Sequence, residues 1–452
     1  MAIESAVSTR RAVIYQLFLR AFTPEGTINA AAKLLPHLAS IGVDIVYLCP
    51  ITTSDDDMDR THWSERQRES GIDNPCNPYR LKDYYEIDPE YGTDEDLLAF
   101  VRTAHQLGLR VILDLVYWHC GPKANIIAEH PDFVQRDQNG ELIFNEYNFA
   151  LLNYDNPALR EYLYNNMVYF IDDFDVDGYR ADVACAVPVD FWNEARRRLV
   201  ARKPDLIMLA ESEEPVLHDQ AFDLSYAFRW SYPVNSVFDG KAPATAVKAC
   251  WQELNDLMAA TPPRFVRCID NHDIASDDLE NRQEKRRPLE ANDAALLLDF
   301  TIDGIPFVYN GQEIADATRL SLWSNRFHTH NQCIDWSKAL TADGRARLEF
   351  FKKLTALRHE TPALVTRKTQ WVDNTAPEQV ISFLRLPDST DGKGILVVIN
   401  ASAKAAAGHI DLGLKRGDML GVKMSRGASH RLDGVRLHFD LLPYGFLVIE
   451  MP

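Results

Sequence analysis

The stretch VIYQLFLRAFTPEGTINAAAKLLPHLASIGVDIVYLCP, residues 13–50, decides the fold of this chain. It begins with the apolar run VIYQLFL and ends with a second one, VDIVYLCP, and both are rich in strand-forming residues. Residues 30–41, between them, have the spacing of an amphipathic helix. This order predicts two parallel strands, because parallel neighbours need a long crossover that is usually helical.

The same alternation continues far beyond residue 50. Further helices are predicted at residues 94–107, 156–173 and 188–200, and further strands at 110–116, 176–183, 206–211, 224–230, 265–269 and 305–309. Eight strand signals separated by helical patterns are typical of the α/β class. Eight is also the number of strands that closes a (β/α)₈ TIM barrel.

Two polar segments interrupt this rhythm, and a different pattern follows it. Residues 51–77 and 120–153 each come after a predicted strand, so they are either functional walls on the barrel rim or tolerated surface insertions. After a helix at 345–359 the chain changes to short alternating strands such as QVISFLRL and GILVVINAS. A small antiparallel β domain is therefore predicted to begin within residues 360–374.

The composition indicates which kinds of partner and which cellular compartment fit this chain. The chain has 452 residues, 46% of them hydrophobic, and a formal charge of -18, which disfavours nucleic acid and anionic membranes and suits an uncharged ligand such as a sugar. We expect a cytoplasmic protein, because no export signal or membrane span is recognisable. Its seven cysteines are odd in number and form no CxxC pair, which favours reduced thiols.

Side chains that can take part in catalysis lie at the ends of four predicted strands. The runs are DLVYWH at 114–119, GYRAD at 178–182, AE at 210–211 and DNHD at 270–273. Because parallel strands of a barrel all end at one rim, these runs predict a shared active site there.

Two of these runs suggest an acid and a nucleophile. Arg180 and Asp182 alternate on one face of a strand, so the guanidinium is expected to lower the pKa of Asp182 and keep it ionised. A lone RxD pair is better explained as a buried salt bridge. Glu211 ends an apolar strand, where burial raises the pKa of a carboxyl group, as a general acid requires.

In this order and spacing the four runs resemble the conserved regions of the alpha-amylase family, glycoside hydrolase family thirteen. The segments NPYRLKDYYEIDPEYGTDEDL at 77–97, GIPFVYNGQE at 304–313 and LLPYGFLVIE at 441–450 also resemble it, so the likeness covers nearly the whole chain. It implies a catalytic barrel of residues 1–119 and 154–365, a short B insertion after strand 3 at 120–153, and a C-terminal antiparallel β-sandwich at 366–452.

The resemblance also implies roles for individual residues. Asp182 would be the nucleophile, Glu211 the acid/base and Asp273 the third carboxylate that stabilises the transition state. The residues implied to bind the sugar are Tyr79, His119, Arg180 and His272, whereas Asp114 would support Arg180. An oxocarbenium-like transition state needs nearby negative charge, which agrees with these assignments.

The chain departs from the family pattern in two places. Where the family's calcium-binding asparagine usually stands, Trp118 has no side-chain oxygen, so we expect no cofactor or metal there. Four acidic residues, Asp55, Asp56, Asp57 and Asp59, could bind a cation but are more simply a solvated loop. Arg80 replaces an aspartate of many alpha-glucosidases of the family, which favours malto-oligosaccharides, cyclic ones included, or glycosyl transfer. Trp63, Trp230, Trp323 and Tyr309 are either sugar-stacking platforms or core residues.

The sequence therefore predicts a retaining glycoside hydrolase that cleaves alpha-glucosidic bonds in malto-oligosaccharides or related small, linear or cyclic, alpha-glucans. A transglycosylase would use the same three carboxylates, and a non-catalytic relative would be expected to lose one of them. A metal-dependent barrel hydrolase is disfavoured because the first strand has neither histidine nor carboxylate. The expected partner is a small oligosaccharide; linkage preference and oligomeric state do not follow from the sequence.

Overall fold

A computed structural model describes residues 7–260, 264–277, 282–327, 332–390, 392–413 and 420–451. Eight parallel strands close into a barrel in the order β1-β10-β9-β8-β7-β6-β3-β2, which confirms the predicted (β/α)₈ architecture. They are β1 (Ile14–Leu17), β2 (Ile45–Leu48), β3 (Arg110–Leu115), β6 (Gly178–Ala181), β7 (Ile207–Ala210), β8 (Leu224–Ser225), β9 (Arg264–Arg267) and β10 (Ile305–Tyr309).

Alternating side chains of these strands build two cores. Ile14 on β1 lies in register with Ile45 on β2 and with Phe307 on β10, and all three pack in the barrel interior. The next residues, Tyr15 and Val46, belong to the larger core between the strands and the surrounding helices. Because both faces of the strands are buried, their sequences are nearly continuous apolar runs.

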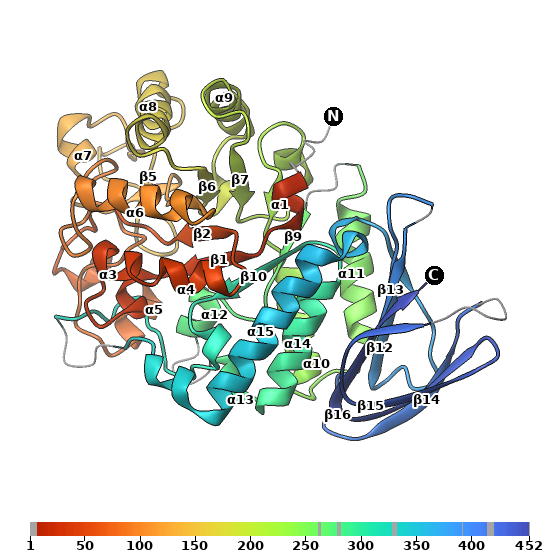
Figure 1. Cartoon of the computed structure of the whole chain (residues 1–452). Coiled ribbons are helices and arrows are strands. Elements are labelled where there is room, and N and C mark those ends of the chain that lie inside the picture. Colours follow the sequence, from red (N-terminus) through yellow and green to blue (C-terminus); the bar gives the residue numbers. More distant parts are fainter. Residues whose placement is uncertain are drawn as a thin grey trace.

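The longer helices form the outer layer of the barrel, as Figure 1 shows. The helices are α1 (Val7–Arg11), α2 (Leu19–Phe22), α3 (Ile28–Ala32), α4 (Leu35–Ser40), α5 (Glu65–Glu69), α6 (Asp94–Gln106), α7 (Asn125–Glu129), α8 (Pro157–Phe174), α9 (Val189–Val200), α10 (Phe228–Phe238), α11 (Thr245–Leu257), α12 (His272–Asp277), α13 (Gln283–Arg286), α14 (Leu289–Thr301) and α15 (Ala342–Glu360). Among the described residues, no helix has both the length and the apolar character that crossing a bilayer requires.

Two predicted elements differ in the structure. The helix predicted at 30–41 is divided into α3 and α4, and Pro36, which has no N–H to donate, lies in the first turn of α4. The strand predicted at 224–230 is wrong beyond Ser225, because α10 begins at Phe228. A short apolar run such as LSYAFRW fits a buried helix as well as a strand, and here Trp230 packs in the core from a helix.

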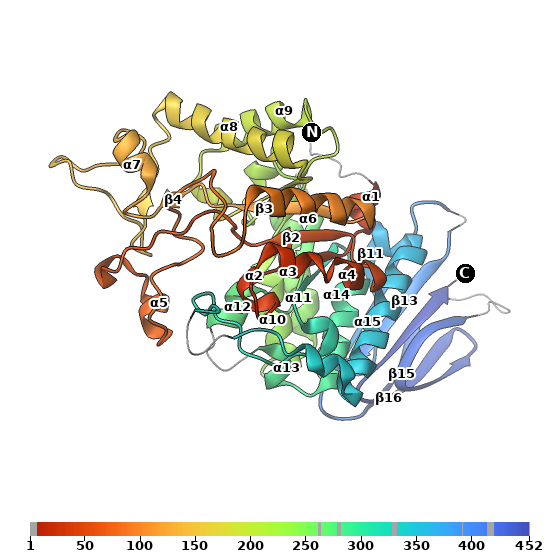
Figure 2. The ribbon, with the colours of Figure 1, turned by 60° about the vertical axis from the view of Figure 1, so that its left-hand side comes forward.

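The two interrupting segments lie on the rim where the strands end. Residues 51–77 contain a 3₁₀ turn (Arg60–His62) and α5, and residues 120–153 contain α7 and part of a two-stranded ribbon, β4 (His119–Cys120) with β5 (Ala150–Leu151). Figure 2 shows α5 and α7 at the margin away from the C-terminal sheet.

The predicted C-terminal antiparallel domain is confirmed as one curled sheet of six strands. They are β11 (Thr369–Trp371), β12 (Val380–Arg385), β13 (Gly394–Asn400), β14 (Ala406–Asp411), β15 (Gly421–Asp433) and β16 (Arg436–Met451). The first half of β16 pairs with β14 and its second half with β13, so the sheet encloses its own apolar core. We did not predict β15, whose sequence GVKMSRGASHRLD is mostly polar and exposed.

Candidate active site

Three carboxylates from distant parts of the chain meet in one cavity at the carboxyl ends of the strands. Asp182 follows β6, Glu211 follows β7, and Asp273 lies in the first turn of α12, after β9. All three line a cavity of about 200 Å³. Convergence at this rim is what the barrel topology dictates for residues that end parallel strands.

The cavity also holds most of the other predicted site residues. Tyr79, His119 and His272 line it, whereas Arg180 lies fully buried beneath it. Ten lining residues were not predicted as site residues. They are Ser64, Arg66, Asn77, Tyr147, Phe149, Val183, Phe228, Tyr232, Leu322 and Trp323, although Trp323 was considered as a stacking platform.

Arg180 connects the carboxylates from below. Its Nη1 atom donates to Asp182 Oδ1 at 2.9 Å and to Asp114 Oδ1 at 2.6 Å, which agrees with the predicted supporting role of Asp114. Its Nη2 atom lies 2.8 Å from Glu211 Oε2 in an ion pair. One guanidinium therefore positions both Asp182 and Glu211.

The expected pKa of Asp182 is wrong in direction. Burial, together with the neighbouring charges of Glu211 and Asp114, raises the pKa of Asp182 well above its usual value, and Arg180 offsets this only in part. Burial also raises the pKa of Glu211, as predicted. Because each negative charge disfavours the other, a proton on Glu211 favours the ionised form of Asp182.

Asp273 behaves differently from these two carboxylates. Burial favours its neutral form, but His272, Arg66 and Arg180 outweigh this effect and lower the pKa of Asp273 to about 2. Arg66 Nη1 donates to Asp273 Oδ1 at 3.1 Å. The cavity therefore contains a carboxylate with a lowered pKa beside a pair whose pKa values are raised.

A hydrogen-bonded chain fixes the protonation of His272. Gln16 Oε1, at the end of β1, accepts the backbone N–H of His272, so the Gln16 amide nitrogen faces His272 Nδ1 at 2.6 Å and donates to it. His272 Nε2 then carries the proton and donates to Tyr79 Oη at 2.7 Å, and Tyr79 donates to Asp114 at 2.9 Å. Burial lowers the pKa of His272, which fits this neutral form.

His119 is held by the protein at both ring nitrogens. Its Nε2 atom donates to the Tyr79 carbonyl at 2.8 Å, and the Asn145 amide lies 3.3 Å from its Nδ1 atom. Burial lowers the pKa of His119 to about 4, so the ring is neutral near pH 7. Asn145 belongs to segment 120–153, so this segment reaches the cavity.

The backbone after Asp182 is strained. Val183 has φ 39° and ψ 52°, a left-handed conformation that a β-branched residue rarely adopts. In this conformation its N–H donates to Glu211 Oε2 at 2.8 Å. Such strain clusters at functional sites, where it helps to orient reacting groups.

Burial shows which of the four aromatic residues proposed as sugar-stacking platforms belong to the core instead. Trp63, Trp230 and Tyr309 are fully buried core residues, and only Trp323 of the four lines the cavity. The most exposed aromatic residue of the cavity lining is Tyr232, at 53%, and its ring stacks on that of Phe228 at 6.1 Å. These two residues were missed because the sequence LSYAFRWSY gave no sign that a helix begins within it.

Arg80 and the acidic loop are structural. Arg80 is fully buried and donates to the carbonyl groups of His62, Asp55, Asp57 and Pro75, so it organises the loop instead of contacting the cavity. Asp55 accepts the backbone N–H groups of Asp57 and Lys123.

The residues at the family's calcium position do not fit that ion. The Trp118 indole offers no oxygen, and the Trp118 carbonyl accepts the backbone N–H of Leu152. We therefore assign no step of the reaction to a metal.

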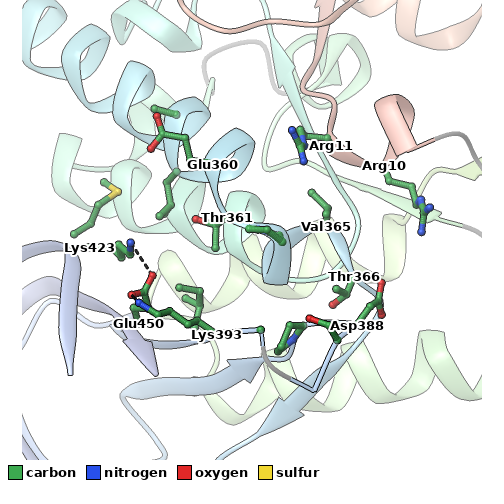
Figure 3. A pocket seen from close by; sticks show the side chains of 18 of the residues that line it. Arg10, Arg11, Glu360, Thr361, Val365, Thr366, Asp388, Lys393, Lys423 and Glu450 are labelled. Atoms are coloured by element: carbon green, nitrogen blue, oxygen red, sulfur yellow. Dashed lines mark hydrogen bonds and ion pairs between the residues drawn. The ribbon is translucent and has the colours of Figure 1, made fainter. Parts of the chain in front are cut away.

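A second, larger cavity of about 940 Å³ lies between the barrel and the C-terminal sheet. Figure 3 shows Arg10 and Arg11 on one side of it and Lys393, Lys423 and Glu450 on the other. Its lining contains neither an aromatic ring nor a catalytic constellation, and Lys393 and Lys423 both pair with Glu450. The smaller cavity is therefore the candidate active site.

Comparisons with known proteins agree with this geometry. The profile of the alpha amylase catalytic domain matches residues 8–140 and 141–351. An intracellular maltogenic amylase from Bacillus subtilis is 27% identical over 388 residues, which cover 80% of this chain and 60% of that protein. A cyclomaltodextrinase from a Bacillus species is 25% identical over 434 residues, 88% of this chain and 70% of that protein.

Solved structures give the same result for the fold. A maltogenic alpha-amylase from Thermotoga neapolitana superimposes with a TM-score of 0.81 at 25% identity, over 98% of this chain and 100% of that one. An alpha-amylase from Lactobacillus plantarum has a TM-score of 0.79 at 24% identity, over 99% and 100%. The chain spans about 60% of the length of the Bacillus subtilis relative.

Proposed function

The chain belongs to the alpha-amylase family, and on this basis we propose that it is a retaining glycoside hydrolase that cleaves alpha-glucosidic bonds in small alpha-glucans. The substrates we propose are malto-oligosaccharides or related linear or cyclic alpha-glucans. Relatives named maltogenic amylase and cyclomaltodextrinase support this substrate class.

One observation carries the proposal: Asp182 and Glu211 both contact the guanidinium of Arg180, at 2.9 and 2.8 Å. Two carboxyl groups held by one side chain are close neighbours. Closely spaced carboxyl groups favour a retaining mechanism, because an inverting pair stands further apart to admit a water molecule between it and the sugar.

In the proposed first step, protonated Glu211 gives its proton to the glycosidic oxygen while Asp182 attacks the anomeric carbon. The bond to the leaving sugar breaks and a covalent glycosyl-enzyme forms. In the second step Glu211, now ionised, takes a proton from water, and the resulting attack on the anomeric carbon releases Asp182. The ionised Asp273 offsets the positive charge that develops on the sugar ring in both steps.

The remaining residues would bind the sugar. Tyr79 and His272, whose rings stack at 5.2 Å, present a flat surface and hydrogen-bonding groups to the ring in the cavity. His119 can contact a hydroxyl through Nδ1 if the sugar replaces Asn145 as its partner. Arg180 would act through Asp182 and Glu211, because it is fully buried.

The test is incubation of the purified protein with maltotriose and maltopentaose, followed by separation of the products and proton NMR of the first anomer released. We expect shorter malto-oligosaccharides whose new reducing ends are initially in the α configuration. Release of the β-anomer would contradict the retaining mechanism, and absence of any hydrolysis would contradict the assignment as a glycosidase.

A second candidate, a transglycosylase, is supported by the stacked rings of Phe228 and Tyr232 in the same cavity as Glu211. An exposed aromatic surface binds the face of a sugar, so it could hold an acceptor in place of water. Maltose at high concentration distinguishes the two: a transglycosylase makes products longer than its substrate, whereas a hydrolase makes only glucose.

The domain limits, 1–119 with 154–365, 120–153 and 366–452, remain part of this proposal. An intracellular location is also proposed, supported by the name of the Bacillus subtilis relative.

A further inference from the structure

Two rim loops meet at one end of the cavity. Arg66 comes from α5 in segment 51–77, and Trp323 comes from the loop after β10; both line the cavity. The Arg66 guanidinium lies over the Trp323 ring, 5.9 Å from its centroid, and Asn74 Nδ2 donates to the Trp323 carbonyl at 2.8 Å. The two loops therefore form one continuous wall.

This wall is internally braced. Ser64 caps α5 by accepting the N–H of Gln67, and Gln67 Nε2 donates to the Asn74 carbonyl at 2.8 Å. Arg80 binds the carbonyl groups of Asp55, Asp57 and Pro75 from beneath the same segment. Arg66 is thus presented to the cavity by a fixed backbone.

The wall stands beside the sugar ring that is attacked, away from the leaving sugar. Glu211 protonates the oxygen of the leaving group, so the leaving sugar lies on its side of the cavity, near Phe228 and Tyr232. Asp273 offsets the positive charge on the ring that is attacked, and Arg66 donates a hydrogen bond to Asp273 at 3.1 Å. Arg66 and Trp323 therefore lie beside the ring that is attacked, on the side of Asp273.

Trp323 also offers a binding group. Its side chain is 2% exposed, and its indole N–H has no hydrogen-bond partner among the described residues. A buried donor of this kind is costly unless something accepts from it, and a hydroxyl group of a sugar is a suitable acceptor. The volume of about 200 Å³ lies below the 300–1,000 Å³ that is common for ligand pockets, which suits one ring.

Building on the proposed function, we infer that Arg66 and Trp323 close the donor end of the cavity, so that the protein acts on the non-reducing end of linear alpha-glucans and releases one sugar unit per cleavage. A ring-shaped glucan has no free end to place against this wall. This inference narrows the proposed substrates to linear glucans, and cyclic glucans should be cleaved poorly by the native protein.

The test compares maltopentaose labelled at its reducing end with β-cyclodextrin, for the native protein and for the variants Arg66→Ala, Arg66→Lys, Trp323→Phe and Arg60→Ala. Arg60 is the matched control: it lies in the same segment and pairs with Asp73 at 3.0 Å, outside the cavity lining. The native protein and Arg60→Ala should give glucose and labelled maltotetraose first. Arg66→Ala should raise the ratio of kcat/KM for cyclodextrin to that for maltopentaose at least about tenfold.

Arg66→Lys keeps the charge on a different head group and should shift this ratio less than Arg66→Ala does. Trp323→Phe keeps the ring but loses the N–H group, so KM for maltopentaose should rise while kcat changes little. The inference is overturned if the native protein cleaves maltopentaose internally or cleaves cyclodextrin as fast as the linear chain. It is also overturned if Arg66→Ala lowers both rates equally. Complete inactivity of the native protein would instead contradict the proposed function.

Discussion

The Nη1 atom of Arg180 donates to Asp114 Oδ1 at 2.6 Å, and both side chains are fully buried. Asp114 also accepts from Tyr79 Oη, so it joins the base of the cavity to the residue that stacks on His272. This carboxylate never lines the cavity, yet it fixes two residues that act on Asp182 and on the sugar.

Substitution Asp114→Ala should therefore impair folding and catalysis together. Removing one partner of a buried ion pair costs about 3–5 kcal/mol, because the remaining charge is left uncompensated. Urea unfolding should show this loss in the free energy of unfolding, and kcat on maltotriose should fall. Asp114→Asn, which retains the shape of the side chain, is the control and should lose less stability. Unchanged stability and kcat in Asp114→Ala would contradict the role given to this contact.

The pH dependence of activity should report on Glu211. Burial raises the pKa of Glu211, and activity requires its protonated form, so kcat/KM should fall as the pH rises above this pKa. Asp273, with a pKa of about 2, stays ionised through the usual range and should not set the acidic limb.

The measurement is the pH profile of kcat/KM on maltotriose for the native protein, and on an aryl alpha-glucoside whose leaving group needs no proton for the native protein and for Glu211→Gln. The native protein should show the alkaline limb on maltotriose and not on the aryl glucoside, and Glu211→Gln should retain activity on the aryl glucoside alone. Retention of maltotriose hydrolysis with an alkaline limb in Glu211→Gln would mean that another group is the acid.

Acid should destabilise the folded protein through His119. Burial lowers the pKa of His119 from 6.5 to about 4, so between these values the unfolded chain binds a proton that the folded protein does not. Stability is therefore fully present above pH 6.5 and is lost as the pH falls. Between pH 7 and pH 5 the loss should be about 2 kcal/mol.

Urea unfolding at both pH values checks this expectation. The native protein should lose about 2 kcal/mol more than His119→Gln, because other titrating groups cancel in the comparison. Equal losses in the two proteins would show that His119 does not carry this effect.

The sequence predicts the barrel well because its strands are buried on both faces. Ile305–Tyr309 is an unbroken apolar run between helices, and the structure has β10 at these residues. The strand predicted at 206–211 corresponds to β7 in the same way. By contrast, β15 is an exposed strand whose sequence has no regular alternation of apolar and polar residues. Its pairing with β16 therefore depends on the tertiary structure.

The site was partly predictable for a related reason. Residues that end a strand, such as Asp182 and Glu211, reach the rim by topology alone. Arg66 and Tyr232 reach it from the helices α5 and α10, whose positions are set by long-range contacts, and nothing in their local sequence indicates this. The predicted direction of the Asp182 pKa is wrong because burial and the charge of Glu211 raise it more than Arg180 lowers it.

The central claim is that Asp182 is the nucleophile of a retaining glycosidase. The direct measurement is the rate of maltotriose hydrolysis by the native protein and by Asp182→Asn, with circular dichroism to confirm that the variant is folded. The account predicts a fall in kcat of about 10⁴-fold or more, as loss of a nucleophile produces in other enzymes. A folded Asp182→Asn variant that hydrolyses maltotriose at close to the native rate would contradict it.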